Sequence, residues 1–144
     1  MDSGINSFIK EQFGLEPVDI RTYSPITLAY IGDAIFDLVI RSLMVDKGNG
    51  RPNDLHKRTS QIVNALTQAM MIVALDGELS EKEADIYRRG RNAKSPTMAK
   101  NASMSDYRKA TGFEALMGYL YLTDDFERVV YLTKKAMELL EIGY

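Results

Sequence analysis

With 144 residues, of which 45% are hydrophobic and 26% charged, the chain is long enough to form one domain with a substantial core. It has no cysteine, which excludes a disulfide framework and a thiolate metal site. No apolar run reaches the roughly 18 residues of a membrane span, and the first residues lack the basic start and apolar core of a signal peptide. We therefore expect a cytoplasmic protein without a membrane partner.

The net charge of -2 conceals a local excess of basic residues. Residues 86–110 contain seven basic residues and one acid, a charge of +6, so the rest of the chain carries -8. The local excess, rather than the total charge, indicates a nucleic-acid partner.

The pattern of apolar residues and helix caps predicts six or seven helices and no strand. Ser24 and Pro25 should open the second helix, Asn53 should cap the third, and Ser80 with Glu83 forms a capping box for the fourth. The expected helices cover residues 5–13, 25–48, 53–75, 80–91, 105–122 and 126–142. We predict an all-α fold in a single domain of residues 1–144.

The second helix carries an acid where an apolar residue would be the simpler choice. Apolar residues cover nearly its whole circumference, so it should be buried on most sides, yet Asp33 follows Gly32 within it. A buried carboxylate needs a partner, a hydrogen bond or a metal ion. Asp37 shares the same face but is a like charge, and Arg41 is spaced to pair with Asp37 instead.

Glu114 is the second candidate partner for Asp33, because it is the one acid within another apolar helical segment. Gly112 and Gly118 flank it, as Gly32 precedes Asp33. Glycine inside a helix costs about 1 kcal/mol relative to alanine, so these glycines indicate closely approaching backbones. Two carboxylates brought together repel, and a divalent cation between them would remove the repulsion. The alternative is two unrelated acids, each satisfied by hydroxyl groups or an arginine.

The same circumferential pattern predicts an oligomer. A monomer of this size can bury only one side of the second helix. The excess apolar face around Ile31, Ile35, Leu38 and Val39 is then available to a symmetry mate in a two-fold interface.

Two segments resemble the signature pair of ribonuclease III catalytic domains. They are LAYIGDAIFDLVIR and, further along the chain, FEALMGYLYL. PNDLHKR and RRGRNAKS extend the match over nearly the whole chain. The resemblance is closer still to the Mini-III ribonucleases, which consist of that catalytic domain alone.

The resemblance implies a homodimeric endonuclease without a separate double-stranded RNA-binding domain. It implies cleavage of double-stranded RNA with Mg²⁺, or with Mn²⁺ in its place, to leave a 5′-phosphate and a 3′-hydroxyl. For a Mini-III enzyme the expected substrate is the large-subunit (23S) ribosomal RNA precursor in the cytoplasm. A ribosomal protein that presents this RNA is a further candidate partner.

By the same resemblance, Asp33 and Glu114 are the metal ligands and catalytic acids. Ala29 and Thr111 stand where full-length ribonuclease III has two more acids, a departure that Mini-III enzymes share. Two protein carboxylates leave more Mg²⁺ positions to water, RNA phosphate or backbone. The number of ions therefore stays open.

Basic and amide side chains are the expected RNA contacts. Double-stranded RNA is recognised through phosphates and 2′-hydroxyls across a shallow minor groove, which suits Arg, Lys, Asn and Ser. The alternative for such a charge run is a solvated face, and for the lone histidine an ordinary surface position. The candidates are His56, Lys57, Arg58, Arg88, Arg89, Arg91, Asn92, Lys94, Ser95, Lys100, Asn101 and Arg108.

Two other functions fit an all-α protein with buried acids. One is a non-catalytic ribonuclease III-like module for RNA binding or ribosome assembly. The other is an all-α metal-dependent nucleotide pyrophosphohydrolase. That class needs several acids clustered at helical spacing, whereas Glu78, Glu81 and Glu83 lie at the start of a helix.

Overall fold

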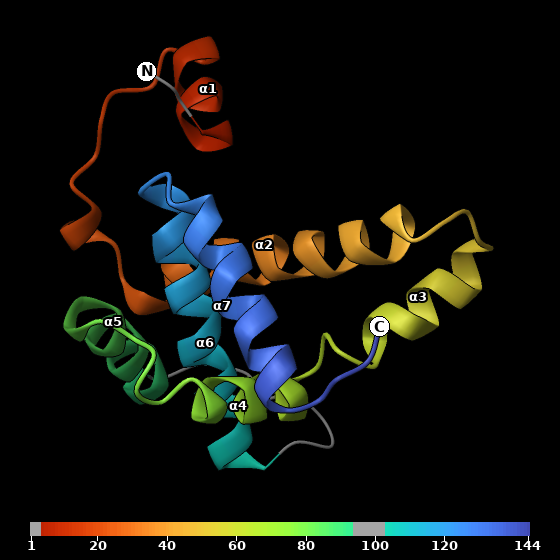
Figure 1. Cartoon of the computed structure of the whole chain (residues 1–144). Coiled ribbons are helices and arrows are strands. Elements are labelled where there is room, and N and C mark those ends of the chain that lie inside the picture. Colours follow the sequence, from red (N-terminus) through yellow and green to blue (C-terminus); the bar gives the residue numbers. More distant parts are fainter. Residues whose placement is uncertain (1–3, 94–102) are drawn as a thin grey trace.

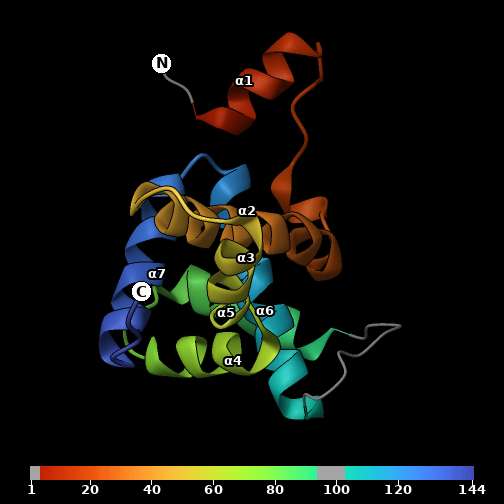
Figure 2. The same cartoon turned by 90° about the vertical axis from the view of Figure 1, so that its right-hand side faces the viewer.

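The computed structural model describes residues 4–93 and 103–144, which form seven α-helices, one 3₁₀ turn and no strand. Helices α2 and α6 cross at the centre, with α4 and α5 on one side of α2 and α1 on the other (Figures 1 and 2). The elements are α1 (Ile5–Gln12), η1 (Ile20–Thr22), α2 (Pro25–Asp46), α3 (Pro52–Ser60), α4 (Ala65–Ala74), α5 (Glu81–Asn92), α6 (Met104–Leu122) and α7 (Phe126–Leu139). The all-α prediction is confirmed.

Two predicted helix starts are confirmed by their hydrogen bonds. The Ser24 side chain accepts from the backbone N–H of Thr27 at 3.1 Å, and Pro25 occupies the first position of α2. At α5, Ser80 and Glu83 form the reciprocal capping box. Local sequence therefore fixes where the central helix and the basic helix begin.

The single helix predicted for residues 53–75 is wrong, because α3 and α4 are separate. Asn64 adopts an extended conformation (φ -156°, ψ 160°), and its side chain accepts from the N–H of Thr67 at 2.9 Å. Asparagine competes for backbone groups in this way and starts a new helix. The expected cap of α3 is also wrong, since Arg51 holds the cap position and Asn53 lies inside the helix.

The α2–α6 crossing is a contact between backbones. A Cβ atom at Gly32 would lie 1.7 Å from the carbonyl oxygen of Glu114. A Cβ atom at Gly118 would lie 1.9 Å from the carbonyl oxygen of Leu28. The close approach that these two glycines predicted is confirmed.

Gly112 lies at the contact of α6 with α5, and not at the predicted contact of α6 with α2. Its added Cβ would meet the Tyr87 ring of α5 at 2.6 Å. On α5, a Cβ at Gly90 would lie 2.8 Å from the Cα of Gly112. Helix α6 therefore contacts α2 through Gly118 and α5 through Gly112.

The apolar face of α2 available to a symmetry mate is narrower than predicted. Ile35 is buried in the core of its own chain, and Ile31 and Val39 are partly buried against that core. Leu38 is exposed, as are Tyr30 and Val45 on the same helix. The large apolar side chains of α2 that remain exposed are therefore these three.

We expect Gly118→Ala to destabilise the fold by about 3 kcal/mol or more, because the new methyl group overlaps backbone atoms that cannot rotate away. Urea unfolding followed by circular dichroism measures this. Gly143→Ala is the matched control, since its Cβ meets nothing within 4 Å. Equal unfolding midpoints for the two variants would contradict a close α2–α6 contact.

Candidate active site

Asp33 on α2 and Glu114 on α6 interact at the crossing of the two helices. Asp33 follows Gly32, whose Cα faces the backbone of Glu114. The two carboxyl groups lie close enough for the negative charge of Asp33 to raise the pKa of Glu114. The structure therefore brings together the two acids singled out in the sequence.

The predicted burial of Asp33 is wrong, because its side chain is exposed. It lines a surface hollow of about 400 Å³ together with Tyr30, Ile31, Ala34 and Asp37. Asp37 forms an ion pair with Arg41 at 2.9 Å, as its spacing predicted. This side of α2 is open to solvent, so an external ligand can reach Asp33.

Glu114 has the opposite environment. Burial raises the pKa of Glu114 to about 8, and the charge of Asp33 and the hydrogen bond with Asp33 raise it as well. The hydrogen bond from Gln68 lowers this pKa in part. Near neutral pH, Glu114 therefore holds a proton in the metal-free protein, and a cation that binds there must displace it.

Gln68 is a site residue that sequence reasoning missed. It is buried on α4, and its Nε2 donates to Oε2 of Glu114 at 3.2 Å. A lone amide in the apolar run LTQAMMIVAL was the available signal. The contact adds α4 to the two helices that build the site.

The donor set at this site consists of oxygen atoms and suits a hard cation. Ala29 is buried one turn before Asp33, and the Thr111 hydroxyl donates within α6 to the carbonyl of Tyr107 at 3.0 Å. In residues 4–93 and 103–144, no group of three or more His, Cys, Asp or Glu side chains is placed to hold a metal ion. Mg²⁺ is commonly held by one or two carboxylates and completes its shell with water and phosphate, so two acids fit it.

The basic residues of α5 differ in their surroundings. Arg88 forms an ion pair with Asp85 at 2.7 Å, and the Arg91 guanidinium lies 5.7 Å from the centre of the Tyr87 ring. Arg89 is exposed, as is Asn92 at the end of the helix. Exposed guanidinium groups on one helix form a surface suited to phosphate.

The other predicted RNA-binding residues lie elsewhere. Helices α3 and α5 lie at opposite ends of the molecule (Figure 1), so His56, Lys57 and Arg58 do not join the α5 surface. Arg108 is exposed near the start of α6, which packs against α5. Lys94, Ser95, Lys100 and Asn101 lie outside the described residues.

The acids around the start of α5 have a structural partner. Arg128 donates to both carboxylate oxygens of Glu83, at 2.8 and 2.9 Å, and to the backbone carbonyl of Glu78 at 2.9 Å. This pairing holds the pKa of Glu83 below its usual value. The Glu83 carboxylate and the Glu78 carbonyl therefore connect the start of α5 to α7, which argues against a pyrophosphohydrolase site there.

Comparison with known families assigns this helical fold, with two acids at a helix crossing, to a class of nuclease domain. The protein-family model described as "Ribonuclease III domain" matches residues 26–125, which include both acids. The chain belongs to the ribonuclease III family, and it is an endoribonuclease.

Within that family, the chain is similar to proteins named Mini-ribonuclease 3. The one from Clostridium tetani is 43% identical over 135 residues, which cover 93% of this chain and 88% of the relative. The one from Enterococcus faecalis is 50% identical over 113 residues, 77% of this chain and 86% of the relative. The crystal structure of protein FN1578 from Fusobacterium nucleatum superposes with a TM-score of 0.76 at 30% identity, covering 85% of this chain and 99% of that one. The predicted family is confirmed.

Across the described part of the chain, no helix combines the length and apolar character needed to cross a bilayer.

We expect Asp33→Asn to lower the pKa of Glu114 from about 8, because it removes the neighbouring negative charge. Carboxyl ¹³C NMR of the metal-free protein across pH 4 to 10 measures this, with Glu114→Gln to assign the resonance. Asp37→Asn, on the same face of α2, is the control and should leave the titration in place. An unchanged Glu114 titration in Asp33→Asn would contradict the contact.

Proposed function

We propose that the protein is a Mg²⁺-dependent endoribonuclease that cleaves double-stranded RNA, with Asp33 and Glu114 as the ligands of the ion. The observation that carries this proposal is the pairing of the two acids at the α2–α6 crossing in a ribonuclease III family chain. Mn²⁺ offers a similar preference for oxygen ligands and is the expected substitute.

The different surroundings of the two acids suit them to different roles in holding the ion. Glu114 is held by Gln68 and by the packed backbone of α6, so its carboxylate is a fixed ligand. Asp33 lies in the open hollow, where a scissile phosphate can approach it. When bound, the ion supplies an oriented water and stabilises charge on the leaving oxygen, which gives 5′-phosphate and 3′-hydroxyl ends.

The arginines of α5 supply the proposed RNA contact. Arg88, Arg89 and Arg91 lie within one turn of each other near the end of the helix. Phosphate contacts position a duplex without reading its sequence, as expected for RNA recognised by shape. His56, Lys57, Arg58 and Arg108 are proposed as further contacts on other parts of the surface.

The proposed assembly is a two-fold homodimer that covers Tyr30, Leu38 and Val45 of α2. An isologous pairing brings two copies of the Asp33 hollow to one interface, so that each can act on one strand of a duplex. The proposed substrate is the 23S ribosomal RNA precursor in the cytoplasm, with a ribosomal protein as a candidate for presenting it. Support for this substrate comes from the relatives named Mini-ribonuclease 3.

Asp33→Asn and Glu114→Gln should each reduce cleavage at least about 100-fold, a loss of roughly 2.7 kcal/mol of transition-state stabilisation, while duplex binding persists. Gel-based cleavage with Mg²⁺ and filter binding of the same duplex measure the two properties. Asp76→Asn is the control, because Asp76 is an exposed acid in the turn after α4 and does not line the hollow. Full cleavage by either acid variant would favour a non-catalytic RNA-binding module, and loss of binding with cleavage would assign the acids to the fold.

Arg89→Ala should weaken duplex binding and flatten its salt dependence, by about 0.9 or less in the log–log slope for each phosphate that the protein no longer neutralises. Binding measured from 50 to 300 mM KCl tests this. Lys82→Ala is the matched control on the same helix, since Lys82 lies at the other end of α5 against the Tyr119 ring. Identical slopes for wild type and Arg89→Ala would indicate that Arg89 lies on a solvated face and contacts no phosphate.

A further inference from the structure

Helix α1 turns its polar side towards the protein and its apolar side towards solvent. Asn6 donates to the carbonyl of Leu122 at 3.5 Å, and the Ser7 hydroxyl donates to the carboxylate of Asp124. On the opposite side, Ile5, Phe8 and Ile9 are 55%, 60% and 41% exposed. An exposed apolar helix face of this kind marks an interaction surface.

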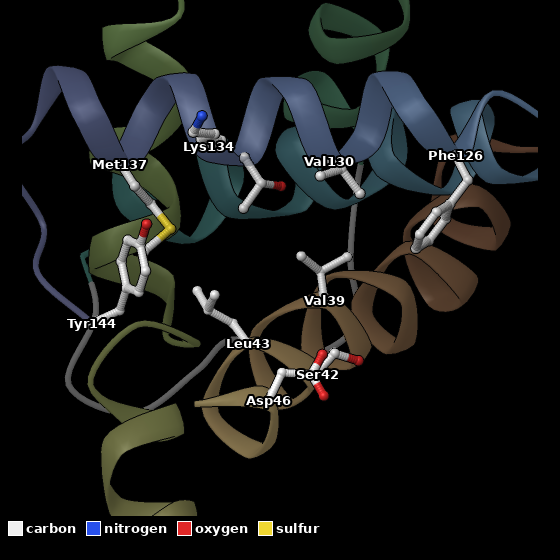
Figure 3. Close-up of a pocket in the computed structure, with 10 residues that line it drawn as sticks. Val39, Ser42, Leu43, Asp46, Phe126, Val130, Lys134, Met137 and Tyr144 are labelled. Carbon is white, nitrogen blue, oxygen red and sulfur yellow. The ribbon is translucent and has the colours of Figure 1, made fainter. Parts of the chain in front are cut away.

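An apolar groove lies between α2 and α7. Its volume is about 290 Å³. Figure 3 shows Val39 and Leu43 of α2 on one side and Val130 and Met137 of α7 on the other. Thr133 also lines it, and its Oγ1 is buried with no hydrogen-bond partner in the part of the chain that the structure describes. An apolar groove with one unsatisfied hydroxyl calls for an occupant that is apolar except for one polar group.

We propose that the apolar face of α1 docks in the α2–α7 groove of a second copy of this chain. This inference rests on the homodimer of the proposed function and adds a reciprocal contact to it. Helix α1 lies outside residues 26–125, the part that matches the ribonuclease III domain. The contact is therefore an addition to the shared domain.

The polar groups of the two surfaces correspond. At 100° per residue, Gln12 falls between Phe8 and Ile5 in the middle of the apolar face of α1. A turn of the Thr133 side chain about χ1 would bring its buried hydroxyl, which lacks a partner among the described residues, to the groove surface. There the Gln12 amide can donate to it or accept from it. One polar residue in an apolar helix face thus meets one polar atom in an apolar groove.

Length and charge also correspond. Eight residues of α1 span about 12 Å, and the stretch of α7 from Phe126 to Met137 that lines the groove spans about 16 Å. Glu11 lies beside the apolar face of α1, about 60° from Phe8, and Lys134, which lines the groove, carries the opposite charge. The helix fits the groove in both respects.

The occupant is the helix of a second copy rather than the chain's own α1. In its own chain, α1 is held at the α6–α7 turn by Asn6 and Ser7 with its apolar face directed away. Docking in the same chain would break those contacts, whereas a second copy leaves them intact. Helix α1 lies on the side of α2 opposite to α4 and α5 (Figures 1 and 2), so a copy seated on that side meets α1 as well.

Disulfide trapping tests the contact, because the chain contains no cysteine. Phe8→Cys in a tagged chain is mixed with Val130→Cys in an untagged chain and oxidised mildly. We expect a covalent pair that contains both chains. Val73→Cys on α4 replaces Val130→Cys as the control, since Val73 is similarly exposed but lies outside the groove. It should give no pair above background.

The double variant Phe8→Cys/Val130→Cys separates the two occupants. A link within one chain would overturn docking on a second copy in favour of docking in the same chain. A wild-type dimer in light scattering with no mixed-chain link would overturn the α1 contact and leave the proposed homodimer standing. A monomeric wild type would overturn both.

A second measurement does not depend on cysteine geometry. Phe8→Asp should raise the dimer dissociation constant at least 10-fold in light scattering. Val73→Asp, an equally drastic change at an exposed position of α4, should leave it unchanged. Equal dissociation constants for wild type and Phe8→Asp would also overturn the contact.

Discussion

The contact between the backbones of α2 and α6 is the constraint on which the structure depends. Gly32 and Gly118 leave no room for a Cβ atom, so the two helices meet without side chains between them. Asp33 directly follows Gly32, and Glu114 precedes Gly118 by about one turn of α6. The approach that closes the core therefore also brings two carboxyl groups together, and neither helix could move away without separating them.

Bringing the two acids together creates an electrostatic cost that a proton or a cation can remove. In the metal-free protein, the raised pKa of Glu114 means that a proton is held there near neutral pH. A divalent ion bound there, as proposed, would compete with that proton, so its binding should become tighter as the pH rises towards 8. Gln68 favours the ionised form by donating to Glu114, which links the packing of α4 to the charge of the site.

The sequence predicts the helices, except for the break between α3 and α4, and two of the glycine contacts, because these follow from caps and local spacing. The pairing of the two acids is predicted from the glycines near them and from the family resemblance. The sequence does not predict which neighbour covers each face. Gly112 and Gly118 are six residues apart, a rotation of about 240° on a helix, so they face different partners. Tyr30 belongs to the apolar pattern of α2 and yet is 81% exposed, and it lines the open hollow beside Asp33. Gln68 could not be assigned because a single amide in an apolar run has no periodicity.

Different faces of helix α2 make different contacts, and their position on one helix links the acid site to the groove against α7. Phe36 and Ile40 enter the core, Gly32 meets α6, Asp33 and Asp37 line the open hollow, and Val39 and Leu43 line the groove against α7. All of these residues lie on one rigid helix of 22 residues. A partner that binds the groove therefore contacts the same rigid element that carries Asp33. Binding of a partner in the groove can therefore fix the position of Asp33 relative to that partner without any rearrangement inside the core.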